Sequence, residues 1–296
     1  MRALTAGIAA AALLAAPAAH ASQDPNPPWP QLLPPFPVSA HNQPRPLPGC
    51  RKATVKCIDV QIRRMQRAQD RFGCDHRAVF ATVYLTLTKA IRTAMLRDRH
   101  LFHDRRYLFR QVTVFAGYYF RMLHAVDRGR PIPEAWRIAI DTAASGDANA
   151  GQDMLLAINA HVQRDMPFVV AQMGLVMPDG TSRKPDHDMG NEILNQAYES
   201  VVQAIQQRYD PIVSLTNASW DPVDDVAGLE MVKGWREGVW RNAERLVNAK
   251  SAGERRQVID QIETNAATWA RMMATPQLPP GYRAQRDAYC HSKLGR

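Results

Sequence analysis

The sequence predicts an all-α protein: one globular multi-helix domain of orthogonal or bundle-like packing, with about eight helices, behind an N-terminal Pro-rich arm. Three observations predict this class. Apolar residues recur at helical spacing from residue 57 onward, no segment alternates in the manner of a strand, and Gly, Pro and capping residues separate the periodic segments. Gly-rich nucleotide-binding motifs and the G-x-S-x-G nucleophile motif do not occur, which argues against the enzyme classes that need them.

Residues 1–21 have the pattern of a secretory signal peptide. Arg2 supplies the positive start, an Ala/Leu-rich segment follows, and Ala19-His20-Ala21 is a small-x-small cleavage site. The alternative, a buried N-terminal helix, is less favoured because the segment is not amphipathic. We therefore expect a secreted or periplasmic protein that starts at Ser22, with no transmembrane segment in the mature chain.

Ten prolines fall within residues 22–49. Proline fixes φ and lacks a backbone N–H, so this segment is neither helix nor central strand. We expect an extended arm here, followed by a single α-helical domain over residues 50–296.

The expected helices follow in order along residues 57–72, from Asp75 to Arg97, from Asp104 to about Gly129, and along 133–144, 150–173, 186–208, 222–249 and from Ser251 to before Pro276. The segment 150–173 is apolar nearly all round, which predicts a central buried helix. A tail carrying Cys290 ends the chain.

Four cysteines in an exported chain favour two disulfides. Of the three pairings, we prefer Cys50–Cys57, a short local loop, with Cys74–Cys290 tying the tail to an early helix. A zinc site is the weaker alternative, since no C-x-x-C pair occurs.

The formal net charge is +9, which suits contact with anionic lipid headgroups or other envelope polymers. The basic residues are scattered and often stand beside acids, so a solvated surface is the simpler interpretation. Specific nucleic-acid binding is not expected, because no basic run is interleaved with aromatic residues.

The candidate catalytic residues are Asn159, His161 and Asp165. His161 and Asp165 stand four residues apart on the apolar side of the 150–173 helix, so each must be satisfied by a partner. They are either metal ligands or an acid/base pair in a pocket, or they hydrogen-bond each other and neighbouring helices to fix the packing.

A second polar cluster, Asp186, His187 and Asn191, begins a later helix. Asp186 or Asp188 as a helix N-cap is the structural interpretation. The functional interpretation places Asp186, His187 or Asn191 opposite His161 and Asp165, where the five would bind a divalent metal such as zinc.

Two functions from different classes remain open. One is an exported metal-dependent hydrolase, in which the ion lowers the pKa of a bound water. The other is a non-enzymatic exported binding or scaffold protein in which the His–Asp pair is structural.

Five stretches together form a recognisable ordered set: Phe115-Ala-x-x-Tyr119, Pro131-x-Pro-x-Ala-Trp136-Arg, Leu156-x-x-Asn159-Ala-His161-x-x-x-Asp165, Asp186-x-x-x-x-Asn191-x-Ile-Leu194 and Arg236-Glu237-x-x-Trp240. In this set the chain resembles a bacterial family of unknown function labelled five-nine-nine-five. The resemblance implies an α-helical domain and no established activity. The Pro-rich arm and the cysteines are not features that the resemblance implies.

One turn, Ala160-His161-x-x-x-Asp165-Met-Pro167, is also similar to the metal-binding helix of zinc-dependent phospholipase C. That pattern needs a later proline and a further histidine, which are missing here. The likeness leaves room for a smaller metal site, or for none.

Overall fold

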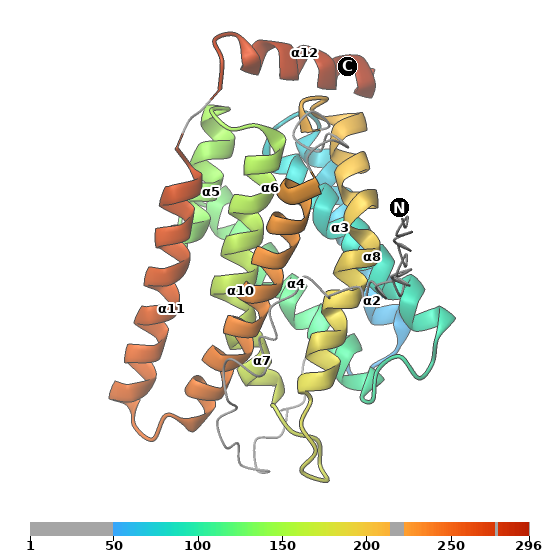
Figure 1. Cartoon of the computed structure of the whole chain (residues 1–296), viewed down its shortest axis with the longest axis vertical. Coiled ribbons are helices and arrows are strands. Elements are labelled where there is room, and N and C mark those ends of the chain that lie inside the picture. Colours follow the sequence, from blue (N-terminus) through green and yellow to red (C-terminus); the bar gives the residue numbers. More distant parts are fainter. Residues whose placement is uncertain (1–49, 214–221, 276–277, 296) are drawn as a thin grey trace, which may run out of the picture.

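The computed structural model describes residues 50–213, 222–275 and 278–295, and these form a bundle of helices (Figure 1). The predicted all-α class is confirmed. Within the described residues the one β feature is an isolated antiparallel bridge between Val176 and Ser182. The predicted signal peptide, 1–21, and Pro-rich arm, 22–49, lie outside the described residues.

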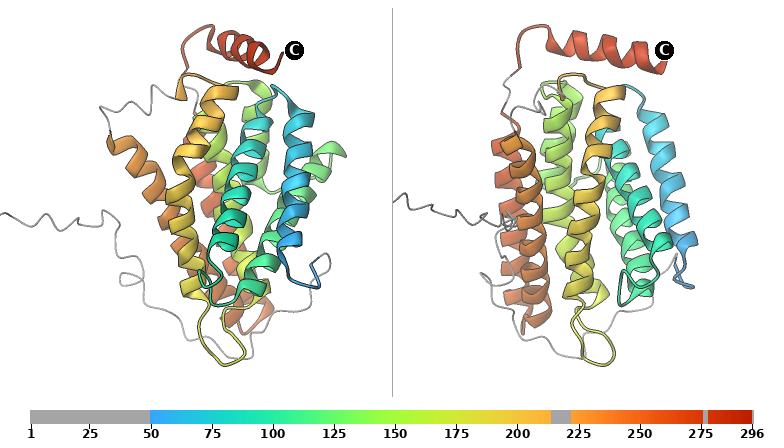
Figure 2. Two further views of the ribbon diagram at one scale, coloured as in Figure 1. Left: turned by 90° about the vertical axis from the view of Figure 1, so that its right-hand side faces the viewer. Right: turned by 45° about the vertical axis from the view of Figure 1, so that its right-hand side comes forward.

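The helices form three layers (Figure 2). The first layer contains α2 (Val55–Phe72), α3 (Arg77–Arg97) and α4 (Arg105–Asp127). The middle layer contains α5 (Glu134–Ser145), α6 (Ala150–Asn159), η1 (Ala160–Asp165), α7 (Met166–Met173) and α8 (Lys184–Arg208). The third contains α10 (Pro222–Asn248) and α11 (Ala252–Met273).

The helix ends follow the capping residues that the sequence offers. Asp104 caps α4 by accepting a hydrogen bond from the Tyr107 amide, and Ser251 caps α11 through the Glu254 amide. Gly146 ends α5 in the left-handed conformation, which glycine adopts without steric cost.

One helix was not expected. Residues Tyr282–Leu294, described above as a tail, form α12, which lies across the end of the bundle (Figure 1). The predicted disulfides are both present: Cys50–Cys57, and Cys74–Cys290, which ties α12 to the turn before α3.

Helix α3 lies deep in the bundle, with fully buried residues such as Ala78, Val79 and Ala81 along it. Among the described residues it is long and apolar enough to cross a membrane, and half of its most apolar window is buried within the protein. The expectation of no transmembrane segment in the mature chain stays a prediction, because length and composition alone do not test it. A central core helix of a globular protein meets the same criterion, so this observation alone assigns no membrane role.

Candidate functional site

The predicted continuous helix over 150–173 is interrupted at the candidate catalytic residues. Residues 160–165 form a π-helical turn, in which the Met166 amide donates to the His161 carbonyl five residues back. Pro167 explains the interruption, because it has no N–H to donate and its ring would clash with the carbonyl four residues earlier in an α-helix. Single π turns of this kind occur frequently at functional sites.

The π turn places His161 and Asp165 in direct contact. His161 Nδ1 lies 3.1 Å from Asp165 Oδ2, and both side chains are almost completely buried. Asp165 also accepts hydrogen bonds from Trp136 Nε1 at 2.9 Å and from Arg164 Nη1 at 2.8 Å. Since the carboxylate faces three donors, Nδ1 is the nitrogen of His161 that carries the proton, and Nε2 carries a lone pair.

Aromatic rings enclose the His161 ring. Phe115 stacks on it at a centroid distance of 3.6 Å with the planes 6° apart, and Tyr84 contacts it edge-on at 4.9 Å. The rings of Phe80 and Trp136 also lie next to it, with centroids 5.7 and 5.8 Å from that of His161. Burial lowers the pKa of His161, against the opposite effect of Asp165, so the ring is neutral at pH 7.

His161 lines a cavity of about 150 Å³ between α3, α4, the π turn, α8 and α10. Most of its wall is apolar, formed by residues such as Leu87, Ile158, Ile193 and Val232. Four buried polar atoms of wall residues have no hydrogen-bond partner among the described residues: Tyr84 OH, Gln111 Nε2, His161 Nε2 and His187 Nδ1. Unpartnered buried polar atoms are uncommon in native proteins, and a cavity whose wall residues carry several of them is a candidate ligand site.

The second predicted cluster divides. Asp186 and His187 line this cavity with His161, as the functional interpretation expected. Asp186, however, accepts hydrogen bonds from the backbone amides of His103 and Asp104 at 2.8 Å each, so its carboxylate holds the start of α4. Neither Asp186 nor Asp188 is the N-cap of α8: Arg183 occupies that position, because the helix starts earlier than expected, at Lys184.

His187 and Asn191 both contact one residue of α10, Arg236. His187 Nε2 donates to the Arg236 carbonyl at 2.9 Å, and Asn191 Oδ1 accepts from Arg236 Nε at 2.7 Å. Burial, together with the Arg236 charge, lowers the pKa of His187 well below its usual value. His187 is therefore neutral and leaves Nδ1 as an acceptor in the cavity wall.

Asn159 lies away from the cavity wall and contacts α11. Its amide donates to the Ala266 carbonyl at 2.8 Å and accepts from Gln163 Nε2 at 2.8 Å. These contacts join the middle layer to the third layer and give Asn159 a packing role; its predicted catalytic role stays a prediction.

The tentative metal set gains no support from this geometry. Within residues 50–213, 222–275 and 278–295, no group of three or more His, Cys, Asp or Glu side chains is arranged to hold an ion. Three of the five proposed ligands, Asp165, Asp186 and Asn191, already have their oxygens engaged by protein donors.

Sequence reasoning missed Tyr84, Gln111 and Arg236 as wall residues. Tyr84 and Gln111 lie in largely apolar helices, and the spacing of apolar residues does not reveal whether a single polar side chain among them faces a cavity. Arg236 appeared only within a family motif, and its burial is visible only once α8 and α10 are packed together.

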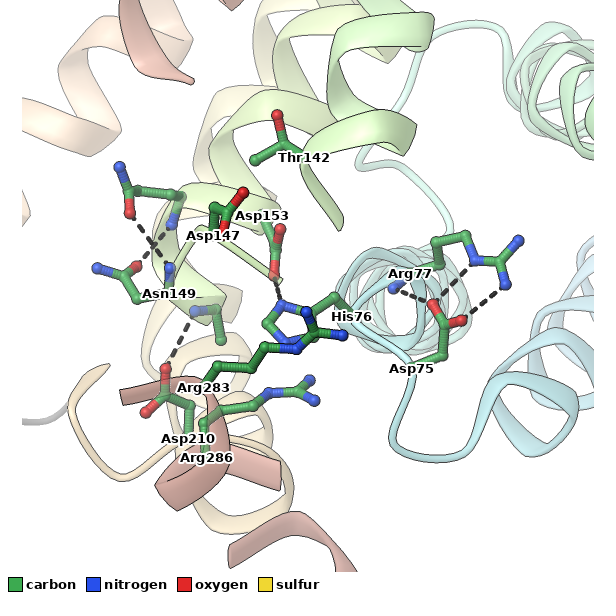
Figure 3. A network of polar contacts seen from close by, with 12 residues as sticks. Asp75, His76, Arg77, Thr142, Asp147, Asn149, Asp153, Asp210, Arg283 and Arg286 are labelled. Atoms are coloured by element: carbon green, nitrogen blue, oxygen red, sulfur yellow. Dashed lines mark hydrogen bonds and ion pairs between the residues drawn. The ribbon is translucent and has the colours of Figure 1, made fainter. Parts of the chain in front are cut away.

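A second buried His–Asp pair occurs at the end of the bundle under α12 (Figure 3). His76 Nδ1 lies 2.7 Å from Asp153 Oδ2, and neither His76 Nε2 nor Asp153 Oδ1 has a hydrogen-bond partner among the described residues. Burial raises the pKa of Asp153, although His76 acts against it. The pair adjoins a polar hollow of about 410 Å³ lined by His76, Arg283, Asp287 and His291.

Comparison with known proteins gives one match. Residues 58–276 match the family described as "Family of unknown function (DUF5995)". No curated protein and no solved structure matches the chain. The likeness to zinc-dependent phospholipase C is not confirmed by these comparisons.

Proposed function

The chain belongs to this family of unknown function, and from the cavity at His161 we propose that it is an exported binding protein for a small, mostly apolar molecule. The observation that carries the proposal is the apolar cavity whose wall holds the unpartnered atoms His161 Nε2 and Tyr84 OH. An apolar cavity of this volume accommodates a ligand about the size of benzene. The polar atoms supply the few directional contacts that orient a ligand in such a site.

A second hollow of about 210 Å³ lies beside the first, so the site could hold a ligand larger than benzene. It shares the wall residues Leu87, Ile158, Leu194 and Val232 with the first cavity. Its other wall residues, such as Val83, Met154 and Val202, are apolar.

The exported part of the proposal is supported by the signal-like sequence of residues 1–21 and by the two disulfides. Disulfides form and persist in oxidising compartments. Fractionation of expressing cells, with sequencing of the mature N-terminus, tests it; a chain retained in the cytosol with Met1 intact would remove this part.

Binding is tested with a neutral fluorescent apolar probe, N-phenyl-1-naphthylamine, titrated against the full chain. We expect saturable binding in the wild type and at least about tenfold weaker binding in Leu194→Phe, which places a ring in the wall that the two hollows share. Ile259→Phe is the matched control, because Ile259 is also half-buried but lines neither hollow. Absence of saturable binding, or equal loss in both variants, would contradict the proposal.

One observation favours a hydrolase as the second candidate. Asp165 fixes the proton of His161 on Nδ1, and the free Nε2 belongs to a residue of the cavity wall, an arrangement that suits a general base. In this form the pair would activate a water, and a metal is an addition that no described ligand group supports. Turnover of short-chain esters that vanishes in His161→Asn while probe binding persists would establish it; elemental analysis of protein purified without chelator tests the metal.

A further inference from the structure

The wall of the His161 cavity contains a buried cation that forms no direct ion pair among the described residues. Arg236 is 8 % exposed, and burial lowers its pKa to about 10, so the guanidinium remains charged at pH 7. Its described partners are all neutral: the Asn191 amide oxygen, the His187 carbonyl and the Met166 sulfur. No direct ion pair to Arg236 is formed within the described part of the chain; the charge of Asp188 acts on it from farther away, and Asp188 itself pairs with Lys184 at 2.9 Å.

The same helix shows how a buried arginine is ordinarily accommodated. Arg241, which is 7 % exposed, lies 2.7 Å from a Glu237 oxygen and 3.1 Å from a Glu244 oxygen. A buried charge is costly unless it is paired and hydrogen-bonded. Arg241 meets this condition within the chain, and Arg236 does not.

The surroundings of Arg236 make room for its guanidinium on the cavity side. Gly190 of α8 lies against it, and a Cβ at that position would collide with Arg236 Nη2. Gly190 and Arg236 both line the cavity, together with Gln111, whose Nε2 donor is unpartnered. The wall residues therefore include one cation without a direct ion pair and one amide donor without a partner, which are groups that bind a carboxylate, while the carboxylate of Asp186 in the same wall is held by the His103 and Asp104 amides.

The remainder of the wall and the adjoining hollow are apolar. The two spaces share Leu87, Ile158, Leu194 and Val232 as wall residues. Two neighbouring hollows divided by flexible apolar side chains suit a flexible chain better than a rigid ring system. A single cation without a direct ion pair, in a wall that also contains Asp186, suits a ligand with one negative charge, since a dianion would leave a second charge buried without a partner.

We propose that the ligand of this cavity is an aliphatic monocarboxylate, a single-chain fatty acid, whose carboxylate pairs with Arg236 and whose chain passes from the His161 cavity into the adjoining hollow. This inference rests on the proposed binding function and adds the charge and shape of the ligand. His187, whose Nδ1 is an acceptor, lies beside the cation and takes no part in holding the carboxylate.

The test compares three ligands of equal chain length by calorimetric titration at monomeric concentrations: dodecanoate, dodecanol and dodecylamine. For the wild type we expect dodecanoate to bind at least about tenfold more tightly than dodecanol, which is the usual effect of a charge-assisted hydrogen bond, and dodecylamine to bind most weakly. Arg236→Gln should reduce the preference for acid over alcohol to within about twofold. Arg236→Lys, which keeps the charge, should restore part of it.

Arg245→Gln is the matched control, because Arg245 lies on the same helix, is half-buried and lines neither hollow. It should retain the wild-type preference. If Arg236→Gln fails to fold, the three ligands compared on the wild type decide the charge preference alone.

The outcomes separate the two proposals. If none of the three ligands binds, the binding function itself falls. If dodecanol binds as tightly as dodecanoate, or if the preference for the acid survives in Arg236→Gln, the cavity is a binding site but the monocarboxylate assignment is overturned.

Discussion

The molecule contains two buried His–Asp pairs that differ in how the carboxylate is satisfied. In the pair His161–Asp165, the carboxylate also accepts from Trp136 and Arg164. In the pair His76–Asp153, one carboxylate oxygen has no described partner. The first pair faces an apolar cavity and the second a polar hollow beneath α12.

This difference teaches that a His–Asp contact alone does not identify a site. The partners of the carboxylate decide whether its charge is held, and the lining of the neighbouring space decides which molecule could enter. At His161 both support the proposed ligand site. At His76 the same contact helps to join α3 and α6 near the disulfide-linked α12.

The largest expected effect is the loss of stability on removing the Cys74–Cys290 disulfide, which lies at the same end of the bundle as the pair His76–Asp153. The Cys74–Cys290 disulfide spans 216 residues, against seven for Cys50–Cys57. In the chain-entropy model the longer loop contributes about 5 kcal/mol to the free energy of unfolding and the shorter about 2.5 kcal/mol. Urea unfolding of the double variants Cys74→Ser/Cys290→Ser and Cys50→Ser/Cys57→Ser measures this; equal losses would contradict the loop-length account.

The second-largest expected effect is the loss of stability when each buried carboxylate, Asp165 or Asp153, is replaced by an amide. Asp165→Asn should lower the free energy of unfolding by about 3–5 kcal/mol, because it removes a charge that faces His161, Trp136 and Arg164. Asp153→Asn should cost about 1–2 kcal/mol, since burial already favours the neutral form of Asp153. Chemical denaturation of the two matched variants tests the order, which the opposite ranking would refute.

The smallest effect is a pH dependence around the first cavity. Burial lowers the folded-state pKa of His161 and His187, so the unfolded chain takes up their protons more readily. The free energy of unfolding is therefore undiminished by these histidines above their unfolded-state pKa of about 6.5. It decreases as the pH falls below that pKa, by at most about 2 kcal/mol per histidine at pH 5. Melting curves from pH 7 to pH 5 measure the loss.

Two variants that cannot titrate serve as controls for this pH dependence. His161→Asn and His187→Gln place an amide donor toward Asp165 and the Arg236 carbonyl respectively, as the histidines do. Each should flatten the dependence. A wild-type slope that both variants leave unchanged would assign the effect to other groups.

The sequence predicted what depends on local spacing. Capping residues such as Asp104 and Ser251 marked helix starts, and the four-residue separation of His161 and Asp165 predicted their contact. The disulfide pairing also followed from spacing and compartment.

Features that depend on packing between distant segments were not predictable in this way. His76 and Asp153 are 77 residues apart, and Arg236 reaches the cavity from a helix that begins 57 residues after the π turn ends. The π turn itself was missed because Pro167 was treated as part of a straight helix. Helix α12 was missed because its pattern is weakly apolar and most of its residues are exposed.

The π turn also changes which helices pack against α6, before the turn, and against α7, after it. It admits an extra residue without completing an extra α-turn, so the azimuth of every side chain after Asp165 is offset from that of the residues before Ala160. Helix α6 accordingly faces α3, α5 and α11, while α7 faces α4 and α10. Within this family, two chains with the same hydrophobic pattern but a different residue count between positions 160 and 165 would present different surfaces to the third layer.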